Sequence, residues 1–109
     1  MAKLEIRKNE SIGTLANRIE QGILRGSISA SLEDRVEYTI GDARCIVMVF
    51  ERYSYAGGNR VSMNVTLFQA GTSPVQICAI TSGGSQAVFF KVNTWGEESF
   101  LECLTDVLR

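Results

Sequence analysis

The chain has 109 residues, 45% of them hydrophobic, and its 11 Lys and Arg residues stand against 12 Asp and Glu for a formal net charge of -1. This length and composition are typical of a single globular domain, residues 1–109, and argue against a disordered chain. The near-neutral charge argues against a sequence-independent nucleic-acid binder. No run approaches the 18 or so apolar residues of a membrane span. From the charge and the lack of such a run, we expect neither nucleic acid nor membrane as a partner.

The first two predicted elements are a strand and a helix. Residues 3–8 alternate charged and apolar side chains, which predicts a short strand. A helical period follows, and we expect a helix over 11–25 that is N-capped by Asn9 or Ser11 and ended by Gly26 in a left-handed conformation. Its predicted apolar stripe consists of Ile12, Leu15, Ala16, Ile19 and Ile23.

The period then changes from 3.6 to 2, which indicates strands. Short turns join the runs, so neighbouring strands are expected to be antiparallel. The four predicted strands are 28–40, 43–54, 60–69 and 75–82.

The end of the chain contains one ambiguous segment and one clear helix. Residues 86–93 fit a strand or a helical turn, and the valines and phenylalanines favour a strand over 87–92. Thr94 and Glu97 match a capping box, which predicts that the C-terminal helix begins there. The apolar stripe of this helix is Phe100, Leu101, Leu104 and Leu108.

Turn lengths decide which side chains share a face of the sheet. A two-residue turn near 57–58 and a three-residue loop at 71–73 bring the apolar residues of the last three strands to one face. At 41–42 a two-residue turn would place Val36, Tyr38 and Ile40 on the other face, so we predict a three-residue loop or a bulge there. The predicted fold is an α+β two-layer sandwich in the order β-α-β-β-β-β-(β)-α. Its antiparallel meander sheet of four to six strands has both the N-terminal and the C-terminal helix on one face.

The opposite face is predicted to be mixed. Its expected polar members are Glu33, Arg35, Glu37, Glu51, Ser62, Asn64 and Gln76. Its expected apolar members are Cys45, Val47, Val49, Phe68, Cys78 and Ile80. A contiguous apolar patch of this size indicates a cover, for which we consider a second copy in a homodimer, a small apolar ligand, or the 86–93 segment. The alternative is an ordinary half-solvated sheet with scattered apolar residues.

The cysteines and the absence of histidine bear on compartment and metals. Cys45, Cys78 and Cys103 are far apart and lie in apolar runs, which predicts free thiols in a reducing, cytoplasmic compartment. Without any His or paired-cysteine spacing, we expect no metal site, and nothing in the sequence indicates a cofactor.

No catalytic residue is predicted, and a non-enzymatic binding or self-association domain is the leading hypothesis. The first alternative is a small enzyme that acts on an anionic substrate through Asp or Glu with Arg52 and Arg60. Asp34 is its most unusual carboxylate, because it occupies an apolar position of the pattern, but we interpret it as marking the outer end of the strand or a bulge and as staying in water. The second alternative is a nucleic-acid adaptor that uses the 52–60 hairpin. The Gly-rich stretch 81–86 is interpreted as a turn.

Five segments have a familiar sequence: GDARC at 41–45, ERYS at 51–54, GGNRVS at 57–62, ITSGGSQ at 80–86 and NTWGE at 93–97. Together they resemble a family of short, uncharacterised bacterial proteins found mainly in Firmicutes. The resemblance covers nearly the whole chain and implies a cytoplasmic one-domain protein, with no known activity or functional residue to transfer. The predicted element order also resembles helix-grip and TATA-binding-protein-like sandwiches, which have many unrelated functions.

Overall fold

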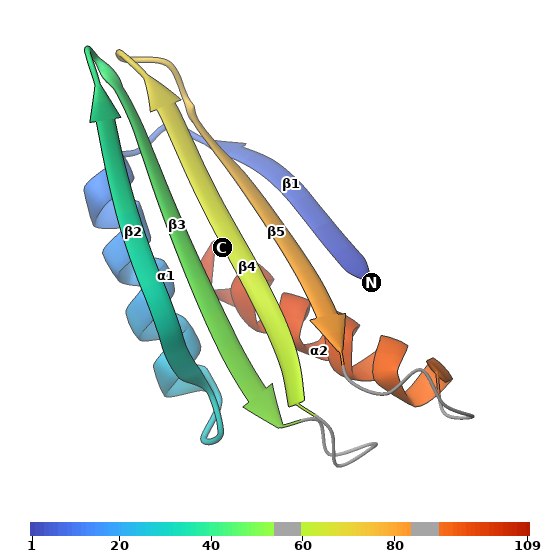
Figure 1. Ribbon diagram of the computed structural model, residues 1–109. Helices are drawn as coiled ribbons and strands as arrows, with labels where there is room; N and C mark the ends of the chain where they lie inside the picture. The colour runs from blue at the N-terminus through green and yellow to red at the C-terminus, as the bar shows by residue number, and fades with distance from the viewer. Residues whose placement is uncertain (54–59, 84–89) are drawn as a thin grey trace.

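The computed structural model describes residues 1–53, 60–83 and 90–109 (Figure 1). The chain begins with a strand and a helix, continues with four successive strands, and ends with a helix. In chain order the elements are β1 (Ala2–Lys8), α1 (Ile12–Gly26), β2 (Ser31–Ile40), β3 (Ala43–Tyr53), β4 (Arg60–Ala70), β5 (Val75–Gly83) and α2 (Phe90–Val107).

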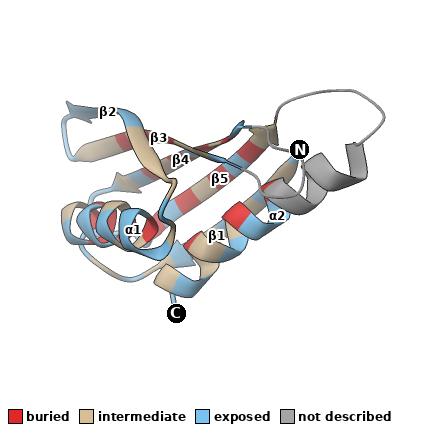
Figure 2. Ribbon diagram, turned by 90° about the horizontal axis from the view of Figure 1, so that it is seen from below, coloured by how far each residue is buried: buried red, intermediate tan, exposed pale blue. Residues whose placement is uncertain are grey.

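The strands form one antiparallel sheet in the order β1-β5-β4-β3-β2. The connection through α1 crosses under the sheet, because β1 and β2 are the two edge strands (Figure 1). Both helices lie on the same side of the sheet (Figure 2). The α+β two-layer sandwich predicted from the sequence is therefore confirmed, with five strands.

The core lies between the helices and one face of the sheet. Alternate residues of β3, β4 and β5 are buried there except at the strand ends, as the period of a strand requires. The predicted stripe of α1 is fully buried. The two helices pack closely, since a Cβ on Gly22 would lie only 2.5 Å from Cγ2 of Val107. The largest buried side chains of this core include Phe50, Phe100, Leu15, Ile19, Ile23, Ile46 and Met48.

The predicted phase of β3, β4 and β5 is confirmed. Leu67 lies opposite both Ile46 and Ile77. The pairing of Phe68 with Gln76 keeps the register that a three-residue loop at 71–73 requires. The turn expected at 57–58 lies outside the described residues.

The predicted loop or bulge at 41–42 is wrong. Ile40 pairs directly with Ala43, which leaves a two-residue turn. Gly41 has a φ of +58°, as the first central residue of a type II′ turn requires. The irregularity lies instead between Leu32 and Asp34, at the other end of β2.

The predicted helix boundaries also need correction. Gly26 is the last residue of α1 and does not have a positive φ, and the chain leaves the helix through Ser27 in an extended conformation. The helix α2 begins at Phe90, so Thr94 and Glu97 lie within the helix instead of capping its start. The strand predicted over 87–92 is wrong for residues 90–92, and residues 87–89 lie outside the described part of the chain.

The open face of the sheet as a candidate binding surface

The sheet has a helix-covered face and an open face. The register places the open-face residues in rows that run across the strands. One row consists of Arg7, Gln76, Phe68, Cys45 and Tyr38. The next row consists of Glu5, Cys78, Thr66, Val47 and Val36. A third row consists of Lys3, Ile80, Asn64, Val49 and Asp34.

The six apolar residues predicted for this face all lie on it. Phe68 is 45% exposed and Ile80 is 39% exposed. The other four are half-buried by their neighbours in the sheet: Cys45, Val47, Val49 and Cys78. Their function in binding stays a prediction.

Three further apolar side chains join this face because of the two-residue turn at 41–42. Val36, Tyr38 and Ile40 are 37%, 60% and 80% exposed. Sequence reasoning assigned them to the core, although glycine at the first turn position favoured the observed hairpin. We call the whole set the apolar strip: Val36, Tyr38, Ile40, Cys45, Val47, Val49, Phe68, Cys78 and Ile80.

Two of the polar residues expected on this face lie on the helix-covered side, so that part of the prediction is wrong. Arg35 Nη1 donates a hydrogen bond to Glu20 Oε1 of α1 at 2.8 Å. Its Nη2 donates to Glu37 Oε2 at 3.0 Å, and Arg44 Nη2 lies 3.2 Å from the other oxygen of Glu37. These side chains connect β2 to α1 along the rim of the core. The two-residue turn at 41–42 sets this phase of β2 and explains the reversal, whereas the bulge between Leu32 and Asp34 changes the phase only of the residues before it.

The two arginines considered for anion binding are not brought together. Arg52 faces α2, where its Nη2 donates to Ser99 Oγ at 2.8 Å and its guanidinium lies 4.6 Å from the centre of the Phe100 ring. Arg60 faces the open side, and its Nε donates to Glu51 Oε1 at 2.7 Å. The carboxylate of Glu51 raises the pKa of Arg60 further.

The contacts of Asp34, the candidate catalytic carboxylate, and of the three cysteines are structural. Asp34 is exposed beside the bulge, where its Oδ1 accepts a hydrogen bond from the backbone N–H of Arg35 at 2.8 Å. The three cysteines are free, and Cys103 lies on the helix side, 3.6 Å from Arg52 Nη1. Among the described residues, no group of three or more His, Cys, Asp or Glu side chains is placed to hold a metal ion.

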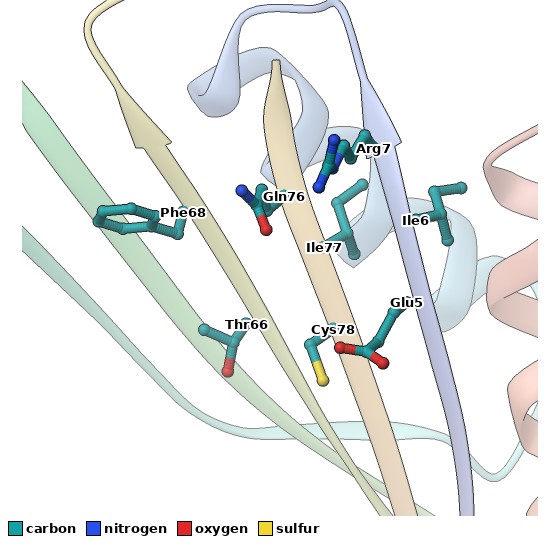
Figure 3. Close-up of a pocket in the computed structure, with 8 residues that line it drawn as sticks. All are labelled: Glu5, Ile6, Arg7, Thr66, Phe68, Gln76, Ile77 and Cys78. Atoms are coloured by element: carbon teal, nitrogen blue, oxygen red, sulfur yellow. The ribbon is translucent and has the colours of Figure 1, made fainter. Parts of the chain in front are cut away.

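A hollow of about 470 Å³ lies on the open face over β1, β5 and β4. Figure 3 shows six of its lining side chains in two rows: Phe68, Gln76 and Arg7 in one, Thr66, Cys78 and Glu5 in the other. Ile6 and Ile77 complete the lining. The short side chains of Thr66 and Cys78 form the low part, because longer ones stand beside them. Sequence reasoning placed Phe68, Cys78 and Gln76 on this face but missed Arg7 and Glu5, which the pairing of β1 with β5 brings to the site.

Fold and surface together define this protein as a five-stranded α+β sandwich with one helix-covered and one open, partly apolar sheet face. The chain belongs to a family of unknown function, DUF6054, whose model matches residues 1–109. The comparisons with the curated proteins and with the solved structures found no match. Within the part of the chain that is described, no helix is long and apolar enough to cross a membrane.

Proposed function

We propose that this chain is a non-enzymatic self-association domain in which a second copy covers the open face of the sheet. The apolar strip is the observation that supports this proposal. Five of its side chains are between 37% and 80% exposed on one face. Monomeric proteins seldom expose contiguous apolar patches above a few hundred Å², because removing apolar surface from water is favourable by about 25 cal/mol per Å².

The size of the open face fits a stable dimer. Five strands about 4.8 Å apart, with a mean length of about ten residues or 33 Å, give a face on the order of 800 Å². A standard stable interface buries about the same area, roughly 800 Å², on each partner. A two-fold pair also presents the same strip from both sides, so each copy supplies the apolar cover that the other needs.

The edges of the sheet are less suited to self-association than its face. On β2, the bulge between Leu32 and Asp34 interrupts the edge, and Asp34 already accepts the N–H of Arg35. On β1, charged side chains alternate along a strand of only 7 residues. Bulges, charges and short length are the usual protections of an edge against pairing with another chain.

The two alternative functions gain no support from the site. An enzyme that holds an anionic substrate between Arg52 and Arg60 needs both guanidinium groups on one surface, and they lie on opposite faces of the sheet. A nucleic-acid adaptor would use the 52–60 hairpin, of which residues 54–59 lie outside the described part of the chain. Arg60 at its end is engaged by Glu51 and lies 3.8 Å from Glu33. A small apolar ligand on the strip is the remaining competitor.

The test is to place a charge in the middle of the strip. Val47 lies between Val36 and Thr66 in the register, so Val47→Lys puts an ammonium group at the centre of the interface. Burying an unpaired charge costs several kcal/mol, and we expect this variant to be monomeric in sedimentation equilibrium while the unmodified chain is dimeric. Thr14→Lys, on the exposed side of α1, is the matched control and should stay dimeric.

Circular dichroism and a cooperative melt establish that the variant is folded. An unmodified chain that is monomeric at all concentrations would contradict the proposal, as would a dimeric Val47→Lys chain. If the monomer carries a small molecule in native mass spectra, the strip belongs to that ligand and the self-association proposal fails.

We also propose that the protein is bacterial and cytoplasmic. The three free cysteines support a reducing compartment. The bacterial origin rests on the resemblance of the five segments at 41–45, 51–54, 57–62, 80–86 and 93–97.

A further inference from the structure

The hollow on the open face exists because of the order of side chains in the sheet. Thr66 and Cys78 lie opposite each other on β4 and β5, and both are short. Phe68 and Gln76, the next pair along these strands, are long and stand beside them as a wall. The result is a hollow of about 470 Å³, within the range of roughly 300–1,000 Å³ that small-molecule sites occupy.

One wall of this hollow offers an aromatic surface. Phe68 is 45% exposed, although its ring has the size and apolarity of a core side chain. In Figure 3 the ring lies at one end of its row and is followed by Gln76 and then Arg7. An exposed ring beside the low floor of Thr66 and Cys78 is suited to contact with a flat apolar group.

The charge at the other end of the row is the positive guanidinium group of Arg7. Glu5 Oε2 lies 3.5 Å from Lys3 Nζ, so the acidic group at the rim already has a cation. Among the described side chains, Arg7 forms neither an ion pair nor a hydrogen bond. Arg7 and Gln76 are paired across β1 and β5, and in Figure 3 the amide nitrogen of Gln76 lies on the side toward Phe68. The N–H groups of both side chains are possible donors to a carboxylate in the hollow.

We propose that this hollow binds a small amphipathic anion, in which a carboxylate is attached to a flat apolar ring. The ring packs against Phe68 and over Cys78 and Thr66. The carboxylate accepts hydrogen bonds from the guanidinium group of Arg7 and the amide of Gln76. This inference goes beyond self-association, because one chain supplies every group of the hollow. Phe68 and Cys78 also belong to the apolar strip, so the anion and a second copy compete for this part of the open face, and the anion is expected to favour the monomer.

A three-probe titration of the unmodified, ¹⁵N-labelled chain tests the proposal. Phenylacetate carries the ring and the charge, phenylacetamide carries the ring alone, and acetate carries the charge alone. We expect phenylacetate to shift the backbone amide signals of Phe68, Gln76 and Cys78 with a Kd on the order of 1 mM, which is reasonable for so small a ligand. Phenylacetamide and acetate should each bind about tenfold more weakly.

A pair of arginine variants locates the charge contact. Arg7→Gln should weaken phenylacetate binding about tenfold and leave the weak phenylacetamide binding unchanged, because only the charge-assisted hydrogen bonds are lost. Arg25→Gln is the matched control, since Arg25 is an exposed arginine on α1 and contacts Gln21. This control should leave phenylacetate binding unchanged.

Three results would overturn the proposal: no shifts at concentrations well above 1 mM, equal binding of phenylacetate and phenylacetamide, or equal loss in the two arginine variants. None of them affects the proposed dimer, which is tested by the mass of the unmodified chain and of Val47→Lys. Conversely, a monomeric chain that binds phenylacetate in an Arg7-dependent way refutes self-association and leaves the ligand site in place.

Discussion

The two faces of the sheet carry similar side chains in different surroundings, and β3 shows the difference most clearly. Ile46, Met48 and Phe50 point to the helices and are fully buried. Val47 and Val49 alternate with them, point away from the helices and are only half-buried. A strand that is apolar on both sides is typical of a sheet covered on both sides. In this chain the helices cover only one face of the sheet. The half-buried valines on the other face are the physical reason to expect that a second copy covers it.

The largest expected effect contrasts one phenylalanine from each face. Phe50→Ala should lower the free energy of unfolding by about 3–5 kcal/mol, because it leaves a cavity beneath the helices. Phe68→Ala should cost less than about 1 kcal/mol at micromolar or lower protein concentration, where the open face meets water. Urea denaturation followed by circular dichroism measures both values.

The same pair also tests the cover. A dimer stabilises the folded chain by mass action, so the cost of Phe68→Ala should increase as the protein concentration increases, whereas that of Phe50→Ala should not. Equal costs for the two variants in dilute protein would show that the open face is packed within the single chain and needs no second copy.

A smaller effect is expected from two glycine substitutions in α1. Gly22 lies on the side of the helix that packs against α2, and Gly13 lies at the end of the helix near Arg44. Gly22→Ala should destabilise the fold by about 1 kcal/mol, since the clash with Val107 outweighs the better helix propensity of alanine. Gly13→Ala should stabilise it by about 0.5–1 kcal/mol, because the nearest atom, Arg44 Nη1, would lie 3.7 Å away in ordinary contact. Thermal and urea unfolding of both variants give the comparison.

A double-mutant cycle tests whether the cost of Gly22→Ala arises from its contact with Val107. Val107→Ala removes the two methyl groups that the new Cβ meets, so adding Gly22→Ala to it should cost less than adding Gly22→Ala to the unmodified chain. Additive costs would mean that the destabilisation has another origin.

The sequence predicted the parts of the fold that strong periodicity controls. The stripe of α1 and the phase of β3, β4 and β5 follow from local apolar patterns, and both are confirmed. The phase of β2 was not predictable in this way. Its local pattern does not decide which side faces the core. The orientation depends on the turn at Gly41 and on the hydrogen bonds of Arg35 to residues distant in the sequence.

The candidate surface was predictable only in part for a similar reason. Residues on neighbouring strands joined by short turns were assigned to the right face, as Phe68 and Cys78 show. The pairing of β1 with β5 joins the first strand to the last, and no local pattern specifies it. The sequence around Arg7 therefore contains no pattern that predicts its position in the hollow.

The most direct test of the covered face uses the thiols of the chain. Cys45 and Cys78 lie on the open face, whereas Cys103 lies on the helix side beside Arg52. We predict that the alkylation rates of Cys45 and Cys78 by iodoacetamide, measured by mass spectrometry of peptides, decrease as protein concentration increases through the dimerisation range, while the rate of Cys103 stays constant. Rates for Cys45 and Cys78 that are independent of protein concentration would contradict a second copy as the cover.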